Sequence, residues 1–202
     1  MVRPSNADKR RAAFLDLNGT LVLPLKQERL DDLVPIPGAI QAVARLTRAG
    51  FACPVITVQS RIAKGLFTSA EFVDWFVDFA AAARQQGADL RGPYLCPHRY
   101  AEPCACKKPN PLLYARAIAE LGISVEDSFV IGDSPDDIRA AVRLGSRGCL
   151  VRTGWAEDPS VVAAVEGQAS LVAPSLVEAV EWILSGRDSL PNGSPCSTVN
   201  KR

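Results

Sequence analysis

The sequence predicts an α/β protein in which helices cover both faces of a mostly parallel sheet. Short apolar runs alternate along the chain with segments whose apolar residues recur every three or four positions, the patterns of buried strands and amphipathic helices. Several apolar runs end in a polar residue and a turn, as parallel strands do at the sheet edge where sites form. We therefore expect a three-layer α/β/α architecture.

One domain is expected over residues 12–185, because 202 residues suffice for a single core and the sequence contains no repeat. Residues 1–11 are polar and lack the apolar segment of a secretory signal, so we expect a flexible N-terminal segment. Residues 186–202 are rich in Ser, Pro, Asn, Gly and charge, and we expect a disordered tail there.

The first strand is expected at residues 12–16, a short apolar run. Residues 24–37 are expected to form a loop because they contain three prolines and are followed by Gly38. A helix follows, in which Ile40, Val43 and Leu46 recur at helical spacing and which Gly50 ends. The second strand is expected at 51–57, although Pro54 cannot donate a ladder hydrogen bond.

The next helix is expected to begin with Ser69 as its N-cap and to end near Gly87, with an aromatic stripe that packs in the core. Residues 93–95 predict a third strand that leads into a segment rich in cysteine. Asn110 then serves as an N-cap before a proline at the first helical position, and this helix ends at Gly122.

Strands and helices alternate through the remainder of the chain. Residues 129–131 predict a strand, and residues 134–144 a helix with a serine cap and acidic residues in its first turn. A strand at 148–151, a short strand at 171–173 and a final helix at 176–184 complete the pattern. The order of elements fits a mostly parallel sheet.

The charge balance gives no sign of certain partners. The chain has 23 Lys and Arg against 22 Asp and Glu, so its overall charge does not indicate nucleic acid or an anionic membrane. No apolar run approaches the roughly 20 residues of a membrane span. Six cysteines without an export signal do not predict a disulfide framework. We expect a monomeric cytoplasmic protein with neither a nucleic-acid nor a membrane partner.

The first strand ends in a motif that indicates a catalytic site. Residues 14–21 read Phe-Leu-Asp-Leu-Asn-Gly-Thr-Leu, so Asp16 lies at the strand tip and Gly19 permits a tight turn. An ordinary strand that ends in an acidic turn has the same appearance, so the motif alone does not decide. The stretch resembles the nucleophile motif Asp-x-Asp-Gly-Thr of the haloacid dehalogenase (HAD) superfamily, with Asn18 in place of the second acid.

Three further residues follow in the order of the HAD motifs: Thr57 ends the second strand, Lys108 follows the cysteine-rich segment, and Asp133 ends a later strand. The resemblance implies that Asp16 attacks phosphorus to form an aspartyl-phosphate. It also implies that the Thr57 hydroxyl and the Lys108 ammonium hold the phosphoryl oxygens. Taken singly, Thr57 and Lys108 fit structural or solvated roles equally well, and only their order indicates the superfamily.

The same resemblance implies a Mg²⁺ site. Its ligands are the Asp16 carboxylate, the main-chain carbonyl of Asn18 and Asp133, with water completing the octahedron. Asp137, one turn into the helix that follows, is expected to support this shell rather than to bind the metal.

A second metal site is indicated by Cys96, His98, Cys104 and Cys106, which include the only histidine of the chain. Three thiolates and an imidazole form a complete tetrahedral set, so a structural zinc is expected in the loop 96–108. The alternative is free cysteines with a histidine nearby by chance.

This loop sharpens the resemblance. A Cys-x-His…Cys-x-Cys segment that runs into a basic residue, Lys and Pro, with no cap domain, resembles the D-glycero-D-manno-heptose-1,7-bisphosphate 7-phosphatases. The histidinol-phosphate phosphatases share this loop. Residues 57–67 read Thr-Val-Gln-Ser-Arg-Ile-Ala-Lys-Gly-Leu-Phe, close to the heptose enzymes' Thr-Asn-Gln-Ser-Gly-Ile-Ala-(Arg/Lys)-Gly-x-Phe. The resemblance implies a Rossmann-like HAD fold and substrate-binding positions at Gln59, Ser60, Arg61, Lys64 and Lys107.

Two departures from the family pattern bear on function. Asn18 cannot protonate a leaving sugar oxygen or activate water, help that is commonly worth about 10²–10⁴-fold. Val58 removes an amide that the family places beside the substrate, and Arg61 adds a cation where the family has glycine. Arg61, Lys64 and Lys107 are therefore expected to hold a second anionic group.

The sequence thus predicts a Mg²⁺-dependent phosphatase of a small phosphorylated sugar, with slow turnover because of Asn18. Three alternatives stay open. The chain is a catalytically weak protein that binds a phosphorylated ligand or a protein partner, a histidinol-phosphate-type phosphatase, or an enzyme that transfers phosphate from a donor with a good leaving group.

Overall fold

The structure, a computed structural model, describes residues 10–186. The flexibility expected of residues 1–11 and the disorder expected of the tail therefore fall almost entirely outside the described residues. Within them, main-chain pairing already begins at Arg10, which forms a bridge with Ile123.

The core of the protein is a parallel six-stranded sheet. Its strands are β1 (Ala13–Leu15), β4 (Cys53–Val58), β5 (Leu90–Cys96), β6 (Phe129–Gly132), β7 (Arg147–Val151) and β8 (Leu171–Ala173). Their order is β5-β4-β1-β6-β7-β8, and every neighbouring pair is parallel. The chain runs outward from β1 to β5 and then returns to the other side of β1. The winding therefore reverses between β1 and β6, the position where such sheets open a crevice for ligands.

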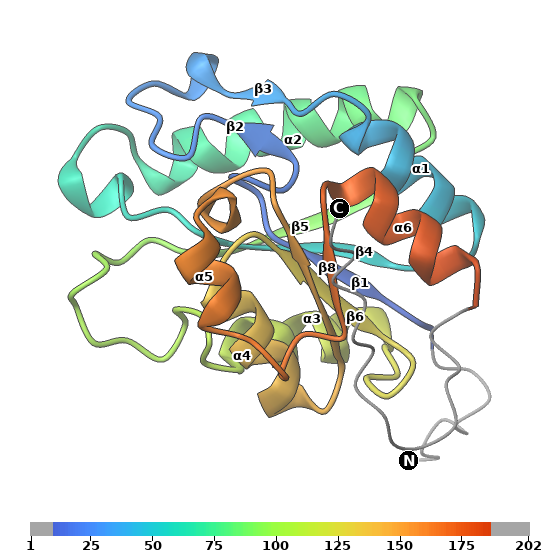
Figure 1. The fold of residues 1–202 in the computed structure, drawn as a ribbon. Helices are drawn as coiled ribbons and strands as arrows, with labels where there is room; N and C mark the ends of the chain where they lie inside the picture. Colours follow the sequence, from blue (N-terminus) through green and yellow to red (C-terminus); the bar gives the residue numbers. More distant parts are fainter. Residues whose placement is uncertain (1–9, 187–202) are drawn as a thin grey trace, which may run out of the picture.

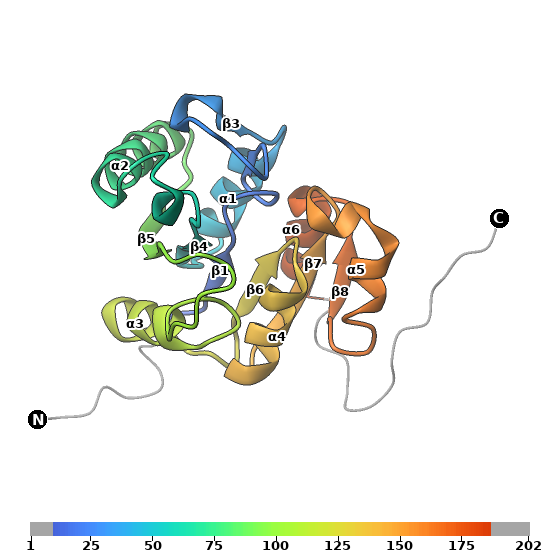
Figure 2. The ribbon, with the colours of Figure 1, turned by 90° about the vertical axis from the view of Figure 1, so that its left-hand side faces the viewer.

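Helices cover both faces of the sheet (Figure 1 and Figure 2). One face carries α1 (Ala39–Arg48), α2 (Ser69–Gln85) and α6 (Leu176–Leu184), and the other α3 (Leu112–Leu121), α4 (Pro135–Leu144) and α5 (Pro159–Ala163). In β1, Ala13 and Leu15 belong to the core on the first face, whereas Phe14 belongs to the core on the second. The predicted three-layer architecture is confirmed.

The segment expected to be a loop contains short elements of its own. Strands β2 (Val22–Leu23) and β3 (Val34–Pro35) form a small antiparallel sheet, with a 3₁₀ turn at Leu30–Asp32 between them. The sequence did not predict these strands, because a strand of two residues has no periodicity to detect and the prolines indicated a loop. The short helix α5 was also not predicted.

Two predicted helix caps are wrong. The cap of α2 is Thr68, whose hydroxyl accepts a hydrogen bond from the Glu71 main chain while the Glu71 carboxylate accepts one from the Thr68 main chain. This reciprocal pair satisfies two free amides and outcompetes Ser69. Asn110 does not cap α3, because its side chain donates to the main-chain carbonyl of Cys104 at 2.9 Å.

Pro54 lies inside β4 despite its missing donor. The register against β5 shifts between Pro54 and Ile56, and this irregularity accommodates the proline. None of the helices between residues 10 and 186 combines the length and the apolar character needed to cross a membrane.

Candidate active site

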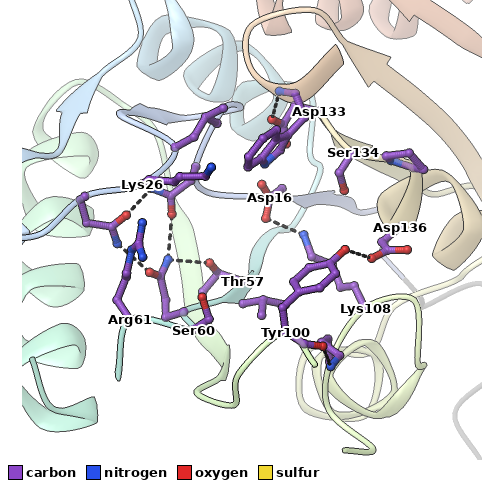
Figure 3. A pocket seen from close by; sticks show the side chains of 18 of the residues that line it. Asp16, Lys26, Thr57, Ser60, Arg61, Tyr100, Lys108, Asp133, Ser134 and Asp136 are labelled. Atoms are coloured by element: carbon purple, nitrogen blue, oxygen red, sulfur yellow. Dashed lines mark hydrogen bonds and ion pairs between the residues drawn. The ribbon is translucent and has the colours of Figure 1, made fainter. Parts of the chain in front are cut away.

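A cavity of about 590 Å³ opens at the carboxyl ends of the central strands. Every catalytic, substrate-binding and magnesium-ligating position expected from the sequence lines it: Asp16, Asn18, Thr57, Gln59, Ser60, Arg61, Lys64, Lys107, Lys108 and Asp133. Figure 3 shows side chains of Asp16, Thr57, Lys108 and Asp133 converging on this space. The structure therefore brings together residues from four separate segments of the chain.

Asp16 follows β1 directly and is only 9% exposed. The Lys108 ammonium donates to its Oδ1 at 2.5 Å (Figure 3). Burial raises the pKa of Asp16 to about 6, although Lys108 opposes this effect. The carboxyl group thus lies at the winding reversal of the sheet with one oxygen held by a cation.

Lys108 is held between two carboxylates. Its ammonium also donates to Asp137 Oδ1 at 2.6 Å, and its side chain is 6% exposed. Burial alone would lower the pKa of Lys108, but the charges of Asp137 and Asp16 raise it well above its usual value. The other oxygen of Asp137 accepts from the Ser134 hydroxyl at 2.6 Å. Both Asp137 oxygens therefore have protein partners, which suits a supporting role for this residue.

Asp133 follows β6 and lies in a cradle of glycines. Its Oδ2 accepts from the Trp155 main chain at 2.7 Å, and a Cβ added to Gly19 or Gly154 would lie 2.2 or 2.0 Å from that same oxygen. Burial, together with the charges of Asp16 and Asp137, raises the pKa of Asp133 to about 8. The backbone of both loops thus approaches this carboxylate more closely than any side chain would permit.

The carboxylate cluster, Asp16, Asp133 and Asp137, fits a hard divalent cation. One oxygen from each lies within 4.8 Å of the others, and all three residues are buried. Like charges buried together raise one another's pKa unless a cation compensates them. Oxygen ligands of this kind are those that Mg²⁺ prefers.

Asn18 does not point its side chain at Asp16 or Lys108. Its amide nitrogen donates to the main-chain carbonyl of Pro24 at 2.9 Å and to Gln27 at 3.2 Å, and its oxygen accepts from Gln59 at 2.8 Å. A carboxylate at this position would lose both donated hydrogen bonds. The amide is therefore suited to its surroundings.

The cations around the cavity fall into two groups. Arg61 and Lys64, on or beside the 3₁₀ turn Ile62–Lys64, form no ion pair with any residue from 10 to 186. The Lys107 ammonium instead donates to main-chain carbonyls of its own loop, those of Arg99, Tyr100 and Glu102. Lys107 lines the cavity but is engaged in holding the loop.

Sequence reasoning missed several residues of the cavity. Lys26 lies 4.8 Å above the Trp155 ring, and the Tyr100 hydroxyl donates to Asp136 at 2.8 Å (Figure 3). Gln27 and Tyr100 occur in segments without periodicity, and neither belongs to a motif. For the approach of the Trp155 main chain to Asp133, the only sign in the sequence is the glycine that precedes Trp155.

The Cys/His cluster, Cys96, His98, Cys104 and Cys106, also converges. Cys96 Sγ lies 3.7 Å from both His98 Nδ1 and Cys104 Sγ, and Cys104 and Cys106 are 3.8 Å apart. Ligands about 2.3 Å from a common zinc in tetrahedral geometry lie roughly 3.8 Å from one another. The chemistry and spacing of these donors fit zinc.

Comparisons with known proteins identify the family. A family model described as HAD-hydrolase-like matches residues 105–179. The D-glycero-beta-D-manno-heptose-1,7-bisphosphate 7-phosphatase of Photorhabdus laumondii is 36% identical over 180 residues, covering 83% of this chain and 92% of that enzyme. The chain belongs to this family. The enzyme of the same name from Escherichia coli K12 is 33% identical over 193 residues, covering 89% of this chain and 91% of that one.

Solved structures agree with the heptose-bisphosphate phosphatase family. The D,D-heptose 1,7-bisphosphate phosphatase of B. bronchiseptica, in complex with magnesium and phosphate, superposes with a TM-score of 0.76. The two chains are 28% identical, and the matched region covers 87% of this chain and 98% of that one. The corresponding phosphatase of Burkholderia thailandensis has a TM-score of 0.64 and 25% identity, with 87% and 99% coverage. The predicted HAD fold is thereby confirmed.

Proposed function

We propose that this protein is a Mg²⁺-dependent phosphatase that removes phosphate from a small phosphorylated sugar, of the heptose-bisphosphate type. The observation that supports this most directly is Asp16, a carboxylate at the winding reversal of the sheet with one oxygen held by Lys108. Family membership gives the reaction class, and the cavity of about 590 Å³ has room for a sugar phosphate.

Asp16 acts as the nucleophile in this proposal. Its free oxygen attacks phosphorus, the bond from phosphorus to the sugar oxygen breaks, and an aspartyl-phosphate forms. The Lys108 ammonium and the Thr57 hydroxyl hold the phosphoryl oxygens as charge spreads over them. Water then attacks phosphorus, releasing phosphate and regenerating the Asp16 carboxylate.

The magnesium ion would be held by Asp16, the main-chain carbonyl of Asn18 and Asp133, and would supply positive charge to the phosphoryl oxygens. Asp137 is left to hold Lys108, since both of its oxygens are occupied by protein donors. The glycines at 19 and 154 let the two loops close on Asp133.

Turnover on a sugar phosphate is expected to be slow. The leaving sugar oxygen needs a proton, and an amide at position 18 has none to give. General acid–base help of this kind contributes about 10²–10⁴-fold. Asn18 is also the observation that favours the second candidate function, binding of a phosphorylated ligand or a protein partner without efficient hydrolysis.

A second anionic group of the substrate is proposed to lie near Arg61 and Lys64. Both line the cavity and have no carboxylate partner among residues 10–186, and Lys26 adds a third cation on the opposite loop. Lys107 contributes by fixing the loop over the cavity. Replacing Arg61 with Gly should raise KM for a bisphosphate about tenfold but leave KM for a monophosphate unchanged. An Arg61→Gly variant with the wild-type KM for the bisphosphate would contradict this assignment.

We also propose that the Cys/His cluster holds a structural zinc. Four protein ligands leave no open position for substrate, and the cluster lies at one end of the loop that positions Lys107 and Lys108. The metal content of the purified protein tests this assignment directly, since one zinc per chain is expected.

Phosphate release with Mg²⁺ tests the function as a whole. The substrates are heptose 1,7-bisphosphate, histidinol phosphate and acetyl phosphate, each given to the wild-type chain and to Asn18→Asp. Release from the heptose bisphosphate that is faster in the Asp variant would support the phosphatase. Preference for histidinol phosphate would favour that branch, and release only from acetyl phosphate would favour phosphotransfer from activated donors. No release from either folded protein would contradict a hydrolytic role.

A further inference from the structure

The side chains of Asn18, Gln27 and Gln59 form a closed ring of three hydrogen bonds in the wall of the cavity, here called the carboxamide ring. Asn18 Nδ2 donates to Gln27 Oε1 at 3.2 Å, Gln27 Nε2 to Gln59 Oε1 at 2.7 Å, and Gln59 Nε2 to Asn18 Oδ1 at 2.8 Å. Each amide donates and accepts once within the ring. Gln27 and Gln59 are each only 2% exposed. Asn18 and Gln27 come from neighbouring loops of the chain, and Gln59 comes from the separate segment after β4.

The direction of the ring is fixed by the backbone. Asn18 Nδ2 also donates to the main-chain carbonyl of Pro24 at 2.9 Å, and a carbonyl can only accept. The Asn18 oxygen must therefore face Gln59, which presents its nitrogen, and the Gln59 oxygen must then receive the Gln27 nitrogen. No amide in the ring is able to flip alone without placing two donors or two acceptors in contact.

The ring reaches the phosphoryl site through Gln59. Its Nε2 donates to Thr57 Oγ1 at 3.0 Å, and Thr57 is 1% exposed. A hydroxyl has one proton, and no acceptor for the Thr57 proton is found among residues 10–186. Because Gln59 occupies the oxygen as a donor, the proton is left for an oxygen in the cavity.

We infer that Gln27 is a positioning residue, which acts through Gln59 to hold the Thr57 hydroxyl as a donor toward a bound phosphoryl group. The inference rests on the proposed function, because it deepens the role of Thr57 at the same site. Gln27 belongs to no motif, and its effect is transmitted through one neighbouring amide. Without Gln27, Gln59 loses the partner of its oxygen and is free to turn away from Thr57.

The ring also gives Asn18 a structural task. An ionised Asp at position 18 would keep the hydrogen bond from Gln59 but would face the carbonyl of Pro24 and Gln27 Oε1 with a negative oxygen. Two acceptors would then face one another at each contact. Asn18→Asp therefore introduces an acid and opens the ring in the same step, so its gain in turnover should fall short of the full acid–base contribution.

Binding of inorganic phosphate in the presence of Mg²⁺ tests the inference by a double-mutant cycle of Gln27→Met and Thr57→Val. Gln27→Met preserves the length of the side chain and removes its polar atoms. Phosphate affinity should fall about five- to tenfold when Gln27 is replaced in the wild-type chain, the effect of about one hydrogen bond. It should fall less than twofold when Gln27 is replaced in the Thr57→Val chain, because Thr57 is the group through which Gln27 acts. Gln41→Met is the matched control, since Gln41 donates to the Gln86 amide at the surface.

Equal losses in both backgrounds, or no more loss than in Gln41→Met, would overturn the inference.

A measurement on the wild-type chain keeps the inference testable if a variant fails to fold. The side-chain amide protons of Asn18, Gln27 and Gln59 should exchange with solvent far more slowly than those of Gln41 and Gln86, and equally fast exchange would refute the ring. A coupled cycle in a protein that hydrolyses no substrate would uphold the inference and reject the phosphatase, whereas an additive cycle in an active enzyme would do the reverse. Absence of phosphate binding to the wild-type chain would overturn both.

Discussion

The carboxylate cluster and the Cys/His cluster are both suited to a metal ion, but they are built in opposite ways. Asp16, Asp133 and Asp137 come from the ends of β1 and β6 and from the start of α4, and each has a partner outside the cluster: Lys108, the Trp155 main chain or Ser134. The Cys/His cluster belongs to the end of β5 and a single loop, and its side chains mainly contact one another. The sheet itself positions the first cluster, whereas the second lies in a loop that the proposed zinc would hold in place.

The two clusters share one electrostatic property. Burial raises the pKa of Cys96 to about 12, just as burial raises the pKa of Asp16 to about 6 and that of Asp133 to about 8. In Asp16, Asp133 and Cys96 burial opposes ionisation, so binding of a metal by these groups would be linked to proton release. The clusters therefore differ in the residues that hold them in place, and not in whether burial opposes the ionisation of their groups.

The largest expected effect comes from Asp16→Asn. Without its nucleophile the protein should lose at least about 10⁴-fold in phosphate release. Its stability without magnesium should be unchanged or higher at pH 8, because the folded protein disfavours the ionised form of Asp16. Initial rates and urea denaturation of the same preparation measure both effects. Asp31→Asn, at an exposed pair with Arg29, is the control, and a large loss of stability in Asp16→Asn would contradict the view that the sheet positions this cluster.

Cys106→Ser should show the reverse pattern. Loss of one zinc ligand removes the support of the loop between Cys96 and Lys108, and we expect a decrease of roughly 3–5 kcal/mol in the free energy of unfolding. Phosphate release should fall less than in Asp16→Asn, because Asp137 still holds Lys108. A chelator should destabilise the wild-type chain to the level of the variant and leave the variant unchanged. Identical unfolding of the wild type with and without chelator would refute the structural zinc.

The carboxylate cluster should make stability depend on pH when magnesium is absent. Asp16 has a pKa of about 6 in the folded protein against 3.8 for the free group, so the folded state binds its proton more tightly. Folding stability therefore falls as pH rises from about 4 to above 6, by about 3 kcal/mol for Asp16 alone, and Asp133 extends the loss toward pH 8. Urea denaturation at pH 5 and pH 8 measures this loss.

Added Mg²⁺ should restore stability at pH 8 and have little effect at pH 5, where protons compete with the metal. Asp133→Asn should flatten the profile without magnesium, because it removes the group with the higher pKa. A metal-free wild-type protein that is more stable at pH 8 than at pH 5 would contradict the assigned charge states.

The difference in construction also explains what the sequence made predictable. Asp16 and Asp133 could be placed because each ends an apolar run, and parallel strands bring such ends to one edge. The pairing of Lys108 with Asp137 and the approach of Gln27 to Gln59 could not, because they depend on side chains from segments that only the folded sheet brings together. The same limit applies to β2 and β3, which are too short for a pattern and yet position the loop that carries Lys26 and Gln27.

The smallest expected effect concerns the support of Lys108. Ser134 caps α4, and its hydroxyl donates to the same Asp137 whose other oxygen accepts from Lys108. Ser134→Ala should lower the free energy of unfolding by about 1 kcal/mol, the usual effect of losing an N-cap. Ser175→Ala removes the cap of α6 far from the cavity and is the matched control for stability. Phosphate affinity should fall two- to threefold in Ser134→Ala but not in Ser175→Ala, because only Ser134 reaches Lys108 through one carboxylate. Equal phosphate affinities in the two variants would mean that Asp137 holds Lys108 without the hydrogen bond from Ser134. The position of Lys108 would then depend on Asp137 and Asp16 alone.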